Sequence, residues 1–232
     1  MKPKGRLAAG LAQIRADLDA VLERDPATRN RVEVALLYPG VHAVWAHRVS
    51  HRLWRRGNKF PARAISQAAR FATNVEIHPA ATLGPRLFID HGAGVVVGET
   101  ATVGADVTLY HGVTLGGRSL GTERRHPTVG DRVIVGAGAK VLGPIEVGAD
   151  SRIGANAVVA KSVPPDSVVV GVPGQIMVRR SDAPTRDGPD PVANAVRTLL
   201  RRVEKLEEAS MSPASERVLY RDGVWEAEDY AI

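Results

Sequence analysis

The stretch Val129–Pro164, "VGDRVIVGAGAKVLGPIEVGADSRIGANAVVAKSVP", decides the fold of this chain. Divided every six residues, it gives six hexapeptides that each begin with Val or Ile, and four of the six carry Gly second. A six-residue unit is too short for a helix and its turn, but it accommodates one short strand followed by a turn. The spacing therefore predicts stacked short strands, whereas an ordinary Gly-rich β-sandwich gives no reason for a fixed six-residue step.

The same step continues on the N-terminal side of this stretch. Aliphatic residues follow it at Ile77, Leu83 and Ile89, and then, after a two-residue slip, at Val97, Val103, Leu109 and Leu115. Three such units make a triangular coil of about eighteen residues, whose aliphatic side chains point inward and stack on their equivalents. We therefore predict a left-handed parallel β-helix of roughly five coils. Gly and Asn are expected at the corners, where the backbone needs unusual dihedral angles.

Two regions of different character flank the repeat. Residues 1–74 read as helices, because "GVHAVWAHRVSHRLWRRG" has its apolar residues at helical spacing and most of its Arg residues off that face. Residues 179–232 read as a Pro-, Asp- and Gly-rich linker, an amphipathic helix and a tail. The predicted fold class is α+β: an N-terminal helical domain (1–74), a β-helix catalytic domain (75–178) and a C-terminal linker, helix and tail (179–232).

The composition excludes several classes of function. The 232 residues include no Cys, which excludes disulfides, a Cys-ligated metal and an acyl group carried on Cys. The net charge of +6 fits a well-solvated surface or a phosphorylated ligand. Nucleic acid is not expected, because the basic residues are scattered and have no aromatic platform. Neither a membrane span nor a signal peptide is evident, so a soluble, cytoplasmic protein is the default expectation.

Polar residues that depart from the repeat are the candidates for chemistry, because a β-helix coil itself needs only aliphatic, small and turn residues. They are Glu76, His78, Asp90, His91, Glu99, His111 and, in the inserted loop "GGRSLGTERRHPT", Arg124, Arg125 and His126. A His with nearby carboxylates is the usual equipment of a general base. An Arg beside a His suits a substrate that carries a carboxylate. For Glu99, a structural role in its turn and a direct role both remain open.

Three segments resemble a known family: "DHGAGVVVGETATVGADVTLYHGVTLGG", "RRHPTVGDRVIVGAGAKVLGPIEVG" and "GVPGQI". They resemble the serine O-acetyltransferases, hexapeptide-repeat enzymes that transfer the acetyl group of acetyl-CoA to L-serine in the committed step of cysteine biosynthesis. Other hexapeptide acetyltransferases share the repeat, but not "DHGAGVVVGET" together with "RHPTVGD". The likeness extends from about Asp25 to Ile176 and implies an acyltransferase that produces O-acetyl-L-serine and CoA.

The resemblance implies roles for residues that match the family's motifs. His91 matches the catalytic base, which takes the proton from the serine hydroxyl. Glu76 matches the acidic partner of that base, at a position where the family usually has Asp. Asp25 and Asp90 match the acids that hold the ammonium group of the substrate.

Two further matches, Arg125 and His126, correspond to the pair that binds the substrate carboxylate. Transfer is expected to be direct, within a ternary complex. The chain has neither Cys nor a G-x-S-x-G elbow, so a covalent acyl-enzyme has no evident nucleophile. No metal and no permanently bound cofactor are expected, and acetyl-CoA serves as co-substrate.

The resemblance also places the CoA arm along the later coils, in the groove between subunits. Gly117, Ala137 and Ala155 match residues that line this groove, where small side chains let the pantetheine arm approach the backbone. Lys140 and Lys161 are candidates for the CoA phosphates, with the reading as solvated surface lysines equally open.

Partners are implied as well. Hexapeptide β-helices favour homotrimers with sites between neighbouring subunits, and a lone trimer is preferred to a hexamer here because the helical region is short. Cysteine is implied as a feedback inhibitor in the serine pocket. The C-terminal Ile232, which follows an acidic stretch, resembles the family tail that inserts into O-acetylserine sulfhydrylase; an ordinary disordered terminus is the alternative.

Three rival functions remain. A γ-type carbonic anhydrase shares the repeat but needs three His on zinc, and the repeat lacks the closely spaced His pair of that site. A non-catalytic scaffold explains the repeat but not the Asp, His and Arg residues that depart from it. An acetyltransferase for a sugar or for another amino acid, such as homoserine, is the third.

Overall fold

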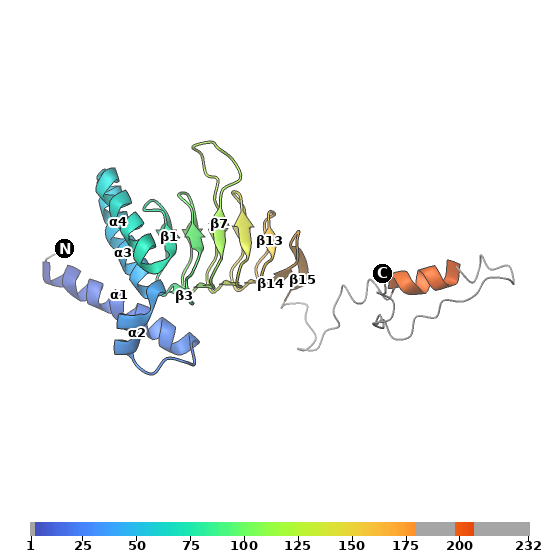
Figure 1. Cartoon of the computed structure of the whole chain (residues 1–232), viewed down its shortest axis with the longest axis horizontal. Helices are drawn as coiled ribbons and strands as arrows, with labels where there is room; N and C mark the ends of the chain where they lie inside the picture. The colour runs from blue at the N-terminus through green and yellow to red at the C-terminus, as the bar shows by residue number, and fades with distance from the viewer. Residues whose placement is uncertain (1–2, 180–197, 207–232) are drawn as a thin grey trace, which may run out of the picture. The chain divides into compact units, whose positions relative to one another are not determined.

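The computed structural model describes residues 3–179 and 198–206 (Figure 1). The chain divides into two compact units, Met1–Ala183 and Pro184–Ile232. The first unit contains helices followed by parallel strands, and the described part of the second is a helix at 198–206. The predicted fold class is confirmed. The division into three domains stays a prediction, and the tail with Ile232 lies outside the described residues.

Four helices precede the strands and gather at the β1 end of the stack (Figure 1). They are α1 (Pro3–Arg24), α2 (Arg31–Leu37), α3 (Pro39–Arg55) and α4 (Lys59–Thr73). Asn30 caps α2, because its side chain accepts hydrogen bonds from the next turn's backbone N–H groups at 3.0 Å. Asn74 ends α4 in the left-handed conformation, with a φ of 56°. None of the described helices has the length and apolar character that crossing a membrane requires.

The strands wind into a triangular solenoid with three faces. The first face contains β1 (Val75–Ile77), β4 (Val95–Val97), β7 (Thr114–Gly116), β10 (Lys140–Leu142) and β13 (Val158–Val159). The second contains β2 (Thr82–Leu83), β5 (Thr102–Val103), β8 (Thr128–Val129) and β11 (Glu146–Val147). The third contains β3 (Phe88–Ile89), β6 (Thr108–Leu109), β9 (Ile134–Val135), β12 (Arg152–Ile153), β14 (Ser167–Val170) and β15 (Gln175–Arg179). Neighbouring strands pair in parallel, except that β15 closes the third face antiparallel to β14.

The predicted aliphatic positions form the core of the solenoid. Leu109 pairs in register with Val135, and Ile153 pairs with both Val135 and Val169. All four side chains are at most 2% exposed. Burying one such aliphatic side chain stabilises a fold by roughly 1.5–3 kcal/mol, so a stacked column on each of the three faces explains why Val, Ile or Leu recurs every six residues.

The corner between the second and third faces, which we call the charge-ladder corner, consists of Arg86, Asp106, Arg132, Asp150 and Asp166. All five residues have left-handed φ angles, between 57° and 62°. The expectation of Gly and Asn is therefore wrong at this corner. Ion pairs of 2.7 Å and 2.6 Å join its first four residues as two Arg–Asp pairs and help to offset the backbone strain.

Two contacts dock the helices on the first two coils. The Arg24 guanidinium, in the last turn of α1, donates to the carbonyls of Asp106 and Arg86 at 3.1 and 2.9 Å. At the start of α3, a Cβ on Gly40 would lie 2.1 Å from the carbonyl oxygen of Ile89, so only glycine permits this approach. The first contact holds the end of α1 at the charge-ladder corner, and the second holds the start of α3 against Ile89 at the end of β3.

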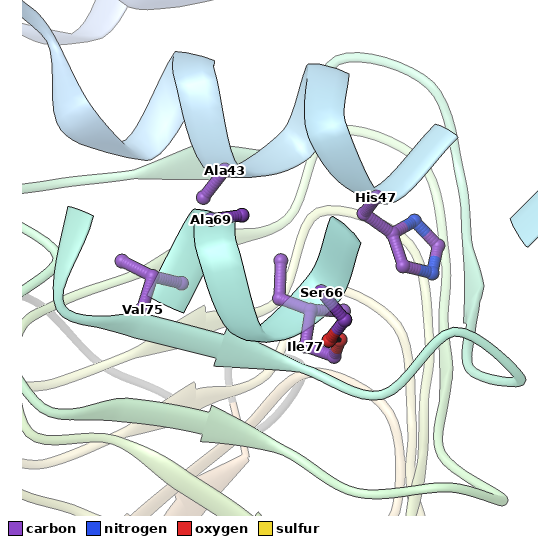
Figure 2. A pocket seen from close by; sticks show the side chains of 6 residues that line it. All are labelled: Ala43, His47, Ser66, Ala69, Val75 and Ile77. Atoms are coloured by element: carbon purple, nitrogen blue, oxygen red, sulfur yellow. Dashed lines mark hydrogen bonds between the residues drawn. The ribbon is translucent and has the colours of Figure 1, made fainter. Parts of the chain in front are cut away.

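The junction of α3, α4 and β1 encloses a small cavity (Figure 2). Its volume of about 10 Å³ leaves room for no more than one water molecule. His47, on its lining, donates from Nε2 to the Ala81 carbonyl at 3.1 Å, and its buried Nδ1 has no partner among the described residues. Burial, and then the neighbouring His51, lowers the pKa of His47 to about 4. His47 is therefore a neutral structural residue, and this cavity is no substrate site.

Candidate active site

The corner that leads from the third face to the first is lined by small residues. This small-residue corner comprises Asn74, Ala93–Gly94, His111–Gly112, Ala137–Gly138 and Ala155–Asn156. Successive coils are joined there by backbone hydrogen bonds of 2.8 to 2.9 Å. The repeated register therefore produces one continuous column along the corner. His91 lies at the start of this column, between β3 and β4 and three residues before Gly94.

The side chain of His91 is exposed to solvent at this corner. Its φ of 58° is left-handed, and its side chain is 74% exposed. Its Nε2 lies 3.7 Å from Asp90 Oδ2, and the ring of His111 meets it edge-on at a centroid distance of 5.9 Å. An accessible imidazole beside a carboxylate can take a proton from a bound hydroxyl.

Asp25 reaches the same corner from the end of α1. Its Oδ1 accepts from the Ala27 backbone N–H at 2.8 Å, and its Oδ2 accepts from the Tyr38 hydroxyl at 2.7 Å. Burial, and then the hydrogen bond to Asp25, raises the pKa of Tyr38 to about 12, and the charge of Asp90 adds to the rise. Asp25 thus binds the Tyr38 hydroxyl directly, and Asp90 is close enough for its charge to act on the same hydroxyl. Two carboxylates in one neighbourhood suit an ammonium group.

Glu76 lies on the outer surface of β1, between the buried Val75 and Ile77. Its Oε2 pairs with Nε of Arg70 at 3.2 Å. No hydrogen bond or ion pair joins Glu76 to His91 within residues 3–179 and 198–206, and the acid that pairs with His91 is Asp90. The role of Glu76 as the partner of the base stays a prediction.

The corner between the first and second faces has a different construction. This inserted-loop corner comprises His78, Gly98–Thr100, the loop 117–127, Gly143 and Lys161. The loop interrupts the six-residue step between β7 and β8 and projects from the solenoid beside β7 (Figure 1).

Arg125 and His126, which are adjacent in the sequence, lie at this corner, and their role in binding a carboxylate stays a prediction. Arg125 donates to Glu99 at 2.6 Å and to the Gly121 carbonyl at 2.9 Å, so both ends of its guanidinium are held. The His126 side chain is buried, and burial, followed by the charge of Arg125, lowers its pKa. Glu99 therefore has at least a positioning contact with Arg125.

Two glycines make room for His126. A Cβ at position 98 would lie 1.9 Å from the His126 ring, and one at position 117 would lie 3.3 Å from His126 Nε2. Gly117, predicted to line the CoA groove, thus packs against the Arg125–His126 pair. Sequence reasoning missed Gly98 and Thr100, although both stand in the "VGET" turn one coil below the insertion.

The other predicted CoA residues divide between the two corners. Ala137 and Ala155 continue the column of the small-residue corner. Lys140 lies beside this corner and donates through Nζ to the Gly112 carbonyl. Lys161 is exposed at the inserted-loop corner.

The first face separates the two sets of residues within one chain. Its strands are two or three residues long, so roughly 7–10 Å of strand lies between the corners. Asp25, Asp90 and His91 are brought together at one corner, and Arg125 and His126 at the other. Within one chain, the two sets of candidate residues therefore lie on different edges of the solenoid. Within the described residues, no group of His, Cys, Asp or Glu is arranged to hold a metal ion.

Comparison with known proteins decides the family. The family described as "Bacterial transferase hexapeptide (six repeats)" matches residues 126–161. The chain is 54% identical to the serine acetyltransferase of Mycobacterium tuberculosis over 228 residues, 96% of this chain and 100% of that protein. It is 49% identical to that of Bacillus pumilus over 211 residues, 88% and 97% of the two chains. The chain belongs to the serine acetyltransferase family.

Solved serine acetyltransferases share this fold. The structure from Neisseria gonorrhoeae in complex with serine is 44% identical, with a TM-score of 0.70 over 72% of this chain and 68% of that one. The structure from Brucella abortus in complex with coenzyme A is 43% identical, with a TM-score of 0.71 over 74% and 69%. A serine acetyltransferase in complex with cysteine is 41% identical, with a TM-score of 0.71 over 72% and 69%. The predicted family is confirmed.

Proposed function

We propose that this member of the serine acetyltransferase family transfers the acetyl group of acetyl-CoA to the hydroxyl of L-serine. The products are O-acetyl-L-serine and CoA, in the committed step of cysteine biosynthesis. The observation that carries the proposal is an exposed His91 beside Asp90 at one corner, together with an Arg125–His126 pair that is held in place at another. Related enzymes bound to serine and to coenzyme A support the choice of substrates.

The two sets of candidate residues complete one another between chains. In the proposed homotrimer, the small-residue corner of one protomer faces the inserted-loop corner of the next. Threefold closed symmetry gives three identical sites of this kind, because each chain offers each corner once. The separation of the corners by the first face is the reason for this arrangement.

The chemistry is direct transfer. His91 takes the proton from the serine hydroxyl while its oxygen attacks the thioester carbonyl carbon. The tetrahedral intermediate then collapses with cleavage of the carbon–sulfur bond, and His91 returns the proton to the departing CoA sulfur. General base catalysis of this kind contributes roughly 10²–10⁴-fold.

The remaining residues hold the substrates. Asp90 and Asp25, the latter fixed by Tyr38, bind the ammonium group of serine. Arg125 and His126 of the next protomer bind its carboxylate.

Acetyl-CoA lies along the small-residue corner. The column that includes Ala137 and Ala155 admits the pantetheine arm, and Gly117 borders the groove from the opposite chain. Lys161 is the better-placed candidate for a CoA phosphate, since Lys140 already donates to a backbone carbonyl. Glu76 acts as the acidic partner of His91. For this, the Glu76 carboxylate must leave its ion pair with Arg70 and pair with the His91 imidazolium instead.

Regulation and assembly complete the proposal. Cysteine occupies the serine pocket through the same Asp and Arg contacts, and a related enzyme has been solved with cysteine bound. The protein acts in the cytoplasm and binds O-acetylserine sulfhydrylase through Ile232. Deleting Ile232 should abolish capture of the sulfhydrylase and leave acetyl transfer unchanged; retained capture would contradict this part.

The assay that tests the function measures thiol release from acetyl-CoA with serine, homoserine, threonine and a sugar as acceptors. The proposal predicts the highest kcat/KM with serine. A preference for another acceptor, or thiol release independent of any acceptor, would overturn it. Zinc in the purified protein with carbon dioxide hydration would favour the carbonic anhydrase alternative instead.

A further inference from the structure

Thr100 links the inserted loop to the coil below it. It lies in the turn after β4, two residues beyond Gly98, and is partly buried. Its Oγ1 lies 3.0 Å from the Arg125 backbone nitrogen, 3.1 Å from the His126 backbone nitrogen and 2.8 Å from His126 Nδ1. One hydroxyl thus contacts the backbone of both carboxylate-binding residues and one of their side chains.

The donors and acceptors at Thr100 determine the tautomer of His126. The two backbone N–H groups can only donate, so they occupy the lone pairs of the hydroxyl oxygen. The hydroxyl hydrogen is then directed to Nδ1 of His126. The backbone N–H of Thr100 also points at this Nδ1, at 3.2 Å. Because Nδ1 accepts from both groups, the ring proton resides on Nε2.

We propose that Thr100 is a positioning residue that fixes His126 as the Nε2–H tautomer, so that Nε2–H donates to the carboxylate of the amino-acid substrate. The proposal rests on the function proposed above, in which Arg125 and His126 bind this carboxylate. Thr100 acts through His126 and does not itself touch the substrate.

The surroundings of Nε2 support this assignment. No described residue forms a hydrogen bond with Nε2, which faces Gly98 and Gly117, where side chains are missing. Burial lowers the pKa of His126, so the ring carries a single N–H near neutral pH. The other tautomer would present a lone pair to the substrate carboxylate, and the two would repel one another.

The kinetic test compares Thr100→Val, which removes the hydroxyl, with Thr100→Ser, which keeps it. We expect Thr100→Val to raise the KM for serine roughly tenfold to a hundredfold, the loss of one hydrogen bond to a charged group, with little change in the KM for acetyl-CoA. Thr100→Ser should restore the KM for serine. Thr102→Val is the matched control, because Thr102 lies exposed in β5 and its hydroxyl makes no hydrogen bond within the described residues.

The structural test is independent of activity. Nitrogen NMR of the wild-type protein with ¹⁵N-labelled histidine, assigned through a His126→Gln variant, should show His126 protonated at Nε2 and not at Nδ1. Thr100→Val keeps the backbone N–H that points at Nδ1 and removes only the hydroxyl, so a population protonated at Nδ1 should appear beside the Nε2–H form. A wild-type Nδ1–H tautomer, or an unchanged tautomer in Thr100→Val, would overturn the proposal even if serine is the substrate. Failure of the wild-type enzyme to acetylate serine would instead overturn the proposed function.

Discussion

The small-residue corner and the inserted-loop corner border the same face of the solenoid, yet they are built in opposite ways. The first is a column of repeated small residues, held by one backbone hydrogen bond per coil. The second is held by side chains, in which Thr100, Glu99 and two glycines position Arg125 and His126. Stacking of identical repeats is enough to produce a column of small residues. A charged group such as Arg125, by contrast, comes from a loop that interrupts the repeat and needs side-chain contacts to hold it.

The comparison predicts the largest loss of activity at the small-residue corner. His91→Ala should lower kcat roughly 10²–10⁴-fold, because the proposed base is removed. Trimers and the affinity for CoA should be unchanged, since His91 is an exposed side chain. Steady-state kinetics with size-exclusion chromatography checks both points, and near-normal turnover in the variant would refute the assignment of the base.

A smaller loss is expected from Gly98→Ala at the inserted-loop corner. The new Cβ would lie 1.9 Å from the His126 ring, which must move. The KM for serine should rise about tenfold, as for one weakened hydrogen bond to a charged group, with kcat less affected. Gly116→Ala is the control, because its Cβ would meet the flexible end of Leu142 at 2.9 Å and the Thr114 methyl at 3.2 Å, but not His126. Equal effects of the two variants would show that the His126 contact is not the cause.

The smallest effect on catalysis should come from the helix junction, which belongs to neither corner. The pKa of His47 is lowered to about 4 from an ordinary 6.5, so below pH 6.5 the unfolded chain binds a proton that the folded chain excludes. The free energy of unfolding should therefore fall as the pH drops from about 6.5 to 4, by on the order of 3 kcal/mol from this residue.

His47→Gln should flatten this pH dependence and leave kcat near its wild-type value. Urea unfolding at pH 7 and pH 4.5, at one protein concentration, measures the difference between variant and wild type. The change in unfolding free energy between the two pH values must be compared in variant and wild type, because the pKa values of His78 and His126 are lowered as well. Both residues therefore also destabilise the folded chain at low pH. An equal change in unfolding free energy in variant and wild type would mean that His47 does not cause the loss of stability at low pH.

The sequence predicted the solenoid well, because the six-residue register directly reflects inward packing of the aliphatic residues. It also indicated the polar departures, since the inward packing of a coil does not require charged residues. It did not reveal the charge-ladder corner, where ion pairs replace the expected Gly and Asn. Thr100 and Gly98 were missed because their importance arises from a loop that folds back one coil, and no local pattern records such a contact. The ion pair of Glu76 with Arg70 likewise joins a helix to a strand across the junction.

We propose that each active site is shared between two chains. The most direct test of this proposal co-expresses His91→Ala and Arg125→Ala chains with different tags and purifies the trimers that carry both. Any mixed trimer then contains one site of three with both corners intact, so the account predicts about one third of wild-type turnover from two inactive parents. Activity no higher than that of either parent would mean that His91 and Arg125 must act from the same chain, and would contradict the account.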